Sequence, residues 1–297
     1  MQLDFIIIGA QKAGSTFVHT ICNEHPDVWV AKNEVAVFEN PDFLEGGMQD
    51  LKKILSKSPD VKSKGIKRPV YLTKPECPGN ISGQYPEAKL IMVLRNPVDR
   101  FISAYYHYIL TGFIPAVDIN DGAHHLLNGD YDDRFPRSKE VVEFGFYGAY
   151  ITLFLEHFRQ DQLLILIYED IKKDPQKFAD QIFEFLGVST IALPGQVLAS
   201  RPMKGVYAIT PGRVSLNKLK NSICYRRNAD NTRLYPRKNI FSKAVGRMAD
   251  WWMAKYYGGS KPKIDPDLRK QLTDIYQPDI EKLEQILGRK LSVWSAK

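Results

Sequence analysis

The chain has 297 residues, of which 44% are hydrophobic and 25% are charged, and its net charge is +7. This composition is typical of a globular protein with one large core or two small ones, and it excludes a disordered or fibrous chain. No apolar run reaches about 18 residues, so we expect no transmembrane helix, and no basic segment of a signal peptide precedes the first predicted strand. Three scattered cysteines without a Cys-x-x-Cys pair argue against a disulfide framework or a zinc site and favour a reducing, cytoplasmic location.

The first predicted elements form a phosphate-binding pattern. Residues 3–8 are an apolar run that predicts a buried strand, and a helix is expected to end near Asn23. Between them lies Gly-Ala-Gln-Lys-Ala-Gly-Ser-Thr, residues 9–16. A loop bracketed by glycines between a strand and a helix directs backbone N–H groups at an anion. The pattern predicts an anionic, nucleotide-like ligand, with a strand–helix turn that binds nothing as the alternative.

The position of the loop lysine narrows the class of ligand. A loop that binds a nucleoside triphosphate has a lysine directly after its second glycine. Here Ser15 follows Gly14, and the lysine, Lys12, stands before that glycine. A magnesium-dependent kinase is therefore a poor fit and ranks second.

A second nucleotide-binding pattern follows a buried strand at residues 89–94. Arg95 comes directly after this strand, and Ser103 lies in the helix that Pro97 is expected to open. Open parallel sheets bind ligands at the carboxyl ends of their strands. A forked guanidinium together with a hydroxyl suits a terminal phosphate. The alternative is an arginine that closes a strand and a serine on a helix surface.

The rest of the chain alternates strands and helices, which predicts an α/β fold with a central parallel sheet flanked by helices and a P-loop-like nucleotide site. The other expected strands lie at 28–30, 35–38 and 163–168. The other expected helices lie at 50–55, 98–110, 138–158, 175–186, 240–257 and 266–287. No linker is evident, so we expect a single domain over residues 1–297. The polar segments 112–137 and 200–240 are expected to cover the substrate or the cofactor.

The positive charge is concentrated in one segment. Residues 201–263 contain fifteen Lys and Arg against two acids, a net of +13, so the remainder carries 7 − 13 = −6. This asymmetry suggests a patch that faces an anion, either the cofactor, an acidic substrate or nucleic acid. A solvated lysine-rich face is the alternative, and no nucleic-acid-binding motif accompanies the charge. We therefore expect neither a nucleic-acid nor a membrane partner.

The two nucleotide patterns resemble those of sulfotransferases that use 3′-phosphoadenosine 5′-phosphosulfate (PAPS), and the resemblance covers nearly the whole chain. It implies that backbone N–H groups of five residues hold the 5′-phosphate: Ala13, Gly14, Ser15, Thr16 and Phe17. It also implies that Lys12 stabilises the leaving phosphate oxygen and that Arg95 and Ser103 bind the 3′-phosphate. A weaker similarity in residues 201–205 places Lys204 over the cofactor. The cofactor is then PAPS, its product is the desulfated PAP, and no metal is expected.

Two further segments resemble the heparan-sulfate branch of that family. Residues 33–38 are similar to its glutamate-bearing strand, which implies that Glu34 is the general base, with a glutamate at a strand edge that pairs with a lysine as the alternative. Residues 65–71 are similar to its Lys-x-Pro-x-Tyr segment, which places Lys67 near the reacting groups. Ala36 stands where an aromatic residue or a histidine is common, which puts the acceptor pocket in doubt.

The resemblance implies in-line transfer of a sulfuryl group to a hydroxyl or amine of a carbohydrate or small metabolite. Two alternatives remain open: a P-loop kinase of a nucleotide or small molecule, and a non-catalytic module that binds an adenine nucleotide or polyanion. His19 and His25 are expected to pack against or cap the first helix. The sequence does not predict the acceptor or the oligomeric state.

Overall fold

The chain forms two compact units. The structure is a computed structural model that describes residues 2–199, 207, 209–228, 232–237, 239–256 and 262–295. The first unit comprises Met1–Asn96, Phe146–Met203 and Pro278–Lys297, and the second comprises Pro97–Gly145 and Lys204–Gln277.

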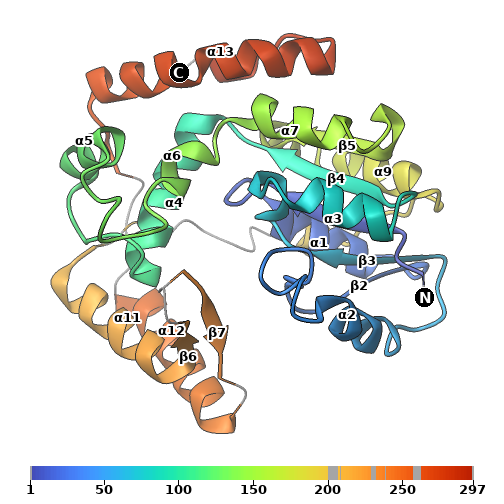
Figure 1. Ribbon diagram of the computed structural model, residues 1–297, viewed down its shortest axis with the longest axis horizontal. Coiled ribbons are helices and arrows are strands. Elements are labelled where there is room, and N and C mark those ends of the chain that lie inside the picture. Colours follow the sequence, from blue (N-terminus) through green and yellow to red (C-terminus); the bar gives the residue numbers. More distant parts are fainter. Residues whose placement is uncertain are drawn as a thin grey trace. The chain divides into compact units, whose positions relative to one another are not determined.

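A five-stranded sheet forms the centre of the first unit (Figure 1). Its strands stand in the order β2 (Val28–Val30), β3 (Ser63–Lys67), β1 (Phe5–Gly9), β4 (Lys89–Leu94) and β5 (Leu163–Ile167). Every neighbouring pair is parallel. All residues of β1 are buried, as expected for a parallel strand covered on both faces. The predicted central parallel sheet is confirmed.

Two apolar clusters pack on the two faces of this sheet. Along β1, Ile6 and Ile8 belong to one cluster and Phe5 and Ile7 to the other, because successive side chains alternate. The Phe5 side is covered by α1 (Ser15–Glu24) and α9 (Pro175–Leu186). The Ile6 side is covered by α2 (Gly47–Leu55), α3 (Cys77–Gln84), α7 (Tyr147–Leu155), the end of α13 (Pro266–Leu287) and α14 (Ser292–Ser295). Shorter elements are η1 (Tyr71–Thr73), η2 (Gln160–Gln162), α8 (Tyr168–Lys173) and α10 (Gly195–Leu198).

The second unit is mainly helical. Its helices are α4 (Pro97–Thr111), α5 (Ile119–Asn128), α6 (Glu140–Glu143), α11 (Pro211–Cys224), α12 (Ile240–Tyr256) and the start of α13. An antiparallel pair, β6 (Tyr225–Arg227) and β7 (Leu234–Pro236), lies between α11 and α12 in the chain. Helix α11 packs against both α4 and α12. None of the described helices is long and apolar enough to cross a membrane.

Two expectations for the strands are wrong. Residues 35–38 form no strand: Val35 N–H bonds to Lys67 O at 3.1 Å, and the chain then turns. Strand β3 is missing from the predicted elements, because its sequence Ser-Lys-Gly-Ile-Lys contains one large apolar side chain. Its glycine, Gly65, accommodates a side chain of the neighbouring strand, since a Cβ there would lie 2.4 Å from Phe5 Cζ.

The single helix expected at 138–158 is also wrong. The segment is divided into α6 and α7. Near the break, a Cβ on Gly145 would lie 2.6 Å from Cε1 of Tyr276, so this close contact requires glycine. The segments 112–137 and 200–240 are more regular than expected, since the first contains α5 and the second contains α11 and the β6–β7 pair.

Candidate active site

The loop between β1 and α1 has the backbone conformation of an anion-binding turn. Lys12 has φ of 68° and Gly14 has φ of 110°, so two of its residues are left-handed. A Cβ on Gly14 would lie 2.9 Å from Tyr168 Cδ2. Glycine is therefore required at this position for both its backbone angle and its close contact with the ring.

The N-terminus of α1 has free backbone donors. The N–H groups of Ala13 and Phe17 already donate to loop oxygens, at 3.2 and 2.8 Å. Within the described part of the chain, the N–H groups of Gly14, Ser15 and Thr16 have no acceptor. The first turn of α1 also carries no acidic residue and no side-chain cap. Three donors and the positive end of the helix dipole are thus available to an anion.

Two cations lie beside this loop. Arg95 Nη1 donates to Lys12 O at 3.5 Å, and the guanidinium lies 5.0 Å from the centre of the Tyr168 ring. Burial and, second, the charge of Arg95 lower the pKa of Lys12 to about 8. Neither cation has a carboxylate partner among the described residues, and Arg95 Nε is buried without a hydrogen bond. Two cations held together without a counter-ion indicate that the site receives an anion.

The backbone around Arg95 is held by a hydrogen-bonded network within the first unit. Tyr147 OH donates to Arg95 O at 3.0 Å, and Asn96 N–H donates to Glu169 Oε1 at 3.2 Å. Trp294 Nε1 donates to the other oxygen of Glu169 at 2.9 Å, and Asn96 Nδ2 donates to Trp294 O at 3.0 Å. The network fixes the end of β4, from which the guanidinium extends.

A second cluster of charged side chains surrounds Glu34. Lys67 Nζ lies 3.5 Å from Glu34 Oε1, and Arg68 Nη1 lies 3.2 Å from Glu34 Oε2. Arg68 also pairs through Nε and Nη2 with both carboxylate oxygens of the buried Glu39. Burial alone would lower the pKa of Arg68, but the hydrogen bond and charge of Glu39 outweigh it and raise that pKa. The Glu34 side chain stays 43% exposed, so an acceptor can reach its carboxylate.

His19 ties α1 to the segment that leads to Glu34. Its Nε2 bonds to Ala31 O at 3.0 Å, which fixes the proton on that nitrogen. Burial and the charge of Lys67 lower the pKa of His19, while the Ala31 bond and Glu34 act in the opposite direction. The imidazole is therefore neutral at pH 7 and holds the turn as a hydrogen-bond donor.

The predicted residues of the first unit gather at one edge of the sheet. Lys12 follows β1, Lys67 ends β3, and Arg95 follows β4, which are three adjacent strands. The structure brings Lys12 together with Arg95, and Glu34 together with Lys67. This is the edge at which parallel α/β sheets bind ligands.

The roles of all the predicted site residues stay predictions, and the structure does not place two of them in the cluster at the strand ends. Ser103 is buried in α4 of the second unit, and its role stays a prediction. Lys204 lies outside the described residues.

Three residues of the site escaped the sequence prediction. Arg68 could have been found from the sequence, because it directly follows Lys67 and two adjacent cations indicate a site for negative charge. Tyr168 is the last residue of a predicted strand, but only the folded chain places its ring beside Arg95 and Trp294 beside Glu169 at the end of β4.

We expect Gly14→Ala to lower the free energy of unfolding by about 2 kcal/mol, because it combines a left-handed backbone with contact against the Tyr168 ring. Urea denaturation measures the change. Gly83→Ala in α3 is the matched control, since nothing lies within 4 Å of its Cβ position, and it should be neutral or stabilising. Equal stability of the two variants would contradict the assigned role of Gly14.

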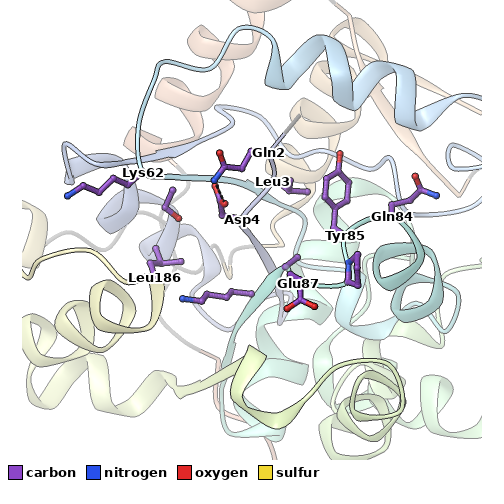
Figure 2. Close-up of a pocket in the computed structure, with 12 residues that line it drawn as sticks. Gln2, Leu3, Asp4, Lys62, Gln84, Tyr85, Glu87 and Leu186 are labelled. Carbon is purple, nitrogen blue, oxygen red and sulfur yellow. Dashed lines mark hydrogen bonds between the residues drawn. The ribbon is translucent and has the colours of Figure 1, made fainter.

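A pocket of about 420 Å³ lies at the opposite edge of the same sheet (Figure 2). It is lined by the starts of β1, β3 and β4 and by the ends of α3 and α9, including Asp4, Tyr85 and Leu186. Its position at the amino ends of the strands separates it from the loop and from Arg95.

A family model described as the sulfotransferase domain matches residues 2–286. The chain therefore belongs to the sulfotransferase family, and the predicted resemblance is confirmed. The match spans both compact units, while the single domain over 1–297 stays a prediction.

Curated relatives include human heparan sulfate glucosamine 3-O-sulfotransferase 3B1, which is 24% identical over 283 residues, covering 95% of this chain and 63% of the relative. A bifunctional heparan sulfate N-deacetylase/N-sulfotransferase 1 of Caenorhabditis elegans is 27% identical over 208 residues, covering 69% of this chain and 24% of that protein. The chain thus spans less than two thirds of the length of these relatives.

Solved structures show the same fold. A sulfotransferase from Alicyclobacillus acidocaldarius matches with a TM-score of 0.69 and 21% identity, over 99% of both chains. Mouse sulfotransferase SULT7A1 complexed with PAP matches with a TM-score of 0.51 and 16% identity, over 94% of this chain and 84% of that one.

Proposed function

We propose that the chain transfers a sulfuryl group from PAPS to a hydroxyl or amine of a carbohydrate or small metabolite. The observation that carries the proposal is the pair Lys12 and Arg95, which lie without a carboxylate partner among the described residues, beside the three free N–H groups of α1. A nucleotide with a phosphate at each end of its ribose supplies anions for both the loop and the guanidinium. The heparan sulfate relatives support a carbohydrate acceptor.

The roles proposed for Glu34 and the lysines describe a single displacement at the sulfur atom of PAPS. The acceptor oxygen or nitrogen forms a bond to sulfur, and the bond between sulfur and the bridging phosphate oxygen breaks. The electron pair of that bond leaves with PAP, and the acceptor proton passes to the Glu34 carboxylate. Lys12 and Lys67 offset the negative charge that develops on the leaving oxygen. Because lysines supply this charge, we propose that no metal takes part, and the cytoplasmic location also remains a proposal.

The lowered pKa of Lys12 predicts how PAP binding depends on pH. In the free protein this pKa is about 8, so Lys12 loses its proton as the pH rises through 8. Because the PAP anion favours the protonated form, its affinity should be flat between about pH 7, where the PAP phosphates are fully ionised, and pH 8, and should fall by about tenfold per unit above pH 8. Calorimetry at a series of pH values checks this. Lys12→Arg keeps its charge over that range, so its profile should be flat. A flat profile for the wild type would contradict the assignment.

An acceptor screen with radiolabelled PAPS tests the proposed function. Labelled product with a carbohydrate or a small alcohol or amine, together with tight PAP binding, is the expected result. Transfer of labelled phosphate from MgATP would favour the kinase. Binding of PAP without transfer to any acceptor class would favour the non-catalytic module, and absence of PAP binding by folded protein would overturn the proposal.

A further inference from the structure

Helix α12 of the second unit carries apolar side chains on its exposed side as well as on its buried side. Its inner side, Ser242, Ala249 and Met253, is buried. Two contacts fix this side against α11: Cys224 Sγ donates to Ser242 O at 3.2 Å, and Arg213 Nη1 donates to Met253 O at 3.3 Å. Helix α12 packs against α11 (Figure 1). The two hydrogen bonds determine which side of α12 faces α11.

The outer side of α12 carries large apolar side chains exposed to solvent. The exposed fractions are 84% for Ile240, 68% for Phe241, 64% for Met248 and 59% for Trp251. At 3.6 residues per turn these four positions fall within about 100° of the helix circumference. They form one stripe, which we call the apolar stripe of α12, opposite to Ser242. Exposed large apolar side chains that share one face of a helix mark an interaction surface.

Positive charges border the apolar stripe. Lys243 and Arg247 are exposed and lie on one flank of it, and Lys255 Nζ lies 5.0 Å from the centre of the Trp251 ring. Helices α11 and α12 together carry six Lys and Arg against one acid, Asp250, which itself pairs with Lys220. The partner of this surface must therefore combine apolar groups with negative charge.

Three kinds of partner can be compared on this chemistry. A second copy of the chain packed antiparallel on the stripe would bring Lys243 and Arg247 of both copies together, which is repulsive. Nucleic acid offers phosphates, but it leaves Ile240 and Met248 without an apolar environment. An anionic bilayer offers lipid headgroups to the cations, an acyl boundary to the aliphatic side chains and the interfacial zone that Trp prefers.

We propose that the apolar stripe of α12 binds the surface of an anionic membrane, with the helix lying in the plane of the interface. This inference rests on the second unit alone and does not depend on the proposed sulfuryl transfer. It gives part of the basic segment 201–263 a specific partner, and it departs from the expectation, made from the sequence, that the chain has no membrane partner.

Vesicle binding by the full chain tests this proposal. The probes are vesicles of phosphatidylcholine alone and of phosphatidylcholine mixed with phosphatidylserine, with brominated acyl chains as quenchers of Trp fluorescence. We expect sedimentation with the mixed vesicles, much weaker binding to phosphatidylcholine alone, and quenching by the brominated lipid. Absence of quenching with either vesicle would overturn the proposal.

Two pairs of variants separate the apolar from the electrostatic part. Phe241→Ser with Met248→Ser should lower the partition coefficient by more than about tenfold, because both side chains lose their apolar environment. Leu44→Ser, at an exposed apolar residue of the first unit, is the matched control and should bind like wild type. Lys243→Glu with Arg247→Glu should abolish the preference for phosphatidylserine, whereas Lys57→Glu in the first unit should not.

Circular dichroism verifies that each variant is folded, and Met248→Ser alone provides a milder substitution with the same expected direction. Unchanged vesicle binding by the apolar variants would overturn insertion and leave only charge attraction. A dimer in sedimentation velocity that is lost in these variants, with no vesicle binding by the wild type, would overturn the membrane in favour of a second copy. If the wild type bound DNA and its Trp fluorescence were not quenched by vesicles, the membrane would be overturned in favour of nucleic acid.

Discussion

Glu34→Gln should lower the transfer rate by about 10²–10⁴-fold while PAP affinity stays within about twofold of wild type. The substitution keeps the shape of the side chain and removes the carboxylate that is proposed to accept the acceptor proton. Glu34 is 43% exposed, but its partner Lys67 is only 11% exposed, so loss of the pair at 3.5 Å should cost about 1–3 kcal/mol of stability, and the rate is compared at a temperature where both proteins are folded. A reduced rate in folded protein would thus report on the chemistry.

The measurement is the single-turnover rate from radiolabelled PAPS to an acceptor found by the screen, with PAP affinity from calorimetry. Glu45→Gln, at an exposed carboxylate away from the cluster, is the matched control and should keep the wild-type rate. If Glu34→Gln turned over like Glu45→Gln, the general base would have to be sought elsewhere. If both binding and rate were lost together, Glu34 would act in holding the site rather than in proton transfer.

The nucleotide loop could be predicted because its information is local. A buried strand, two glycines and a helix without a capping acid follow one another within residues 3–24, and the structure places them as expected. Arg95 was predictable for the same reason, since it directly follows a strand that is apolar on both faces.

The surroundings of Glu34 could not be predicted in full, because they depend on strand pairing. Lys67 lies at the carboxyl end of β3, whose sequence has no strand pattern of its own. Glycine is required at position 65 of this strand because the Phe5 side chain of β1 packs against it. Arg68 pairs with Glu39, which is 29 positions away in the sequence. Glu39 directly follows residues 35–38, which were expected to form a strand but form a turn. Tertiary contacts, rather than local preference, determine this part of the site.

The basic segment shows a third limit. Its charge was visible in the sequence, and it predicted an anionic partner without separating cofactor from surface. Only the packing of Ser242 and Met253 against α11 shows that Ile240 and Met248 of the same segment are directed away from the unit. The tertiary contacts of a basic helix, and not its charge alone, show whether its apolar side chains are buried in the unit or exposed beside its cations.

Arg68→Met should lower the free energy of unfolding by about 3–5 kcal/mol, the largest stability change that we expect in the first unit. The guanidinium pairs with both oxygens of Glu39, with Nη2 at 3.0 Å from Oε2, and the Glu39 side chain is buried. Met approximates the length of the arginine stem but removes both hydrogen bonds of the guanidinium from a carboxylate whose side chain is only 3% exposed. Urea denaturation of each variant measures the loss.

The double variant Arg68→Met with Glu39→Gln decides whether the buried charge is the cause. Because the glutamine amide carries no charge, the double variant should recover a large part of the stability lost in Arg68→Met. Lys62→Met is the matched control, since it breaks the exposed pair with Asp27 at 2.9 Å and should cost less than about 1 kcal/mol. A loss in Arg68→Met no larger than in Lys62→Met would show that the pair contributes little. If the double variant were as unstable as Arg68→Met, the loss would be assigned to the contacts of the arginine stem or to its pair with Glu34. The ion pair with Glu39 would then not be the interaction that stabilises the turn next to Glu34, the proposed base.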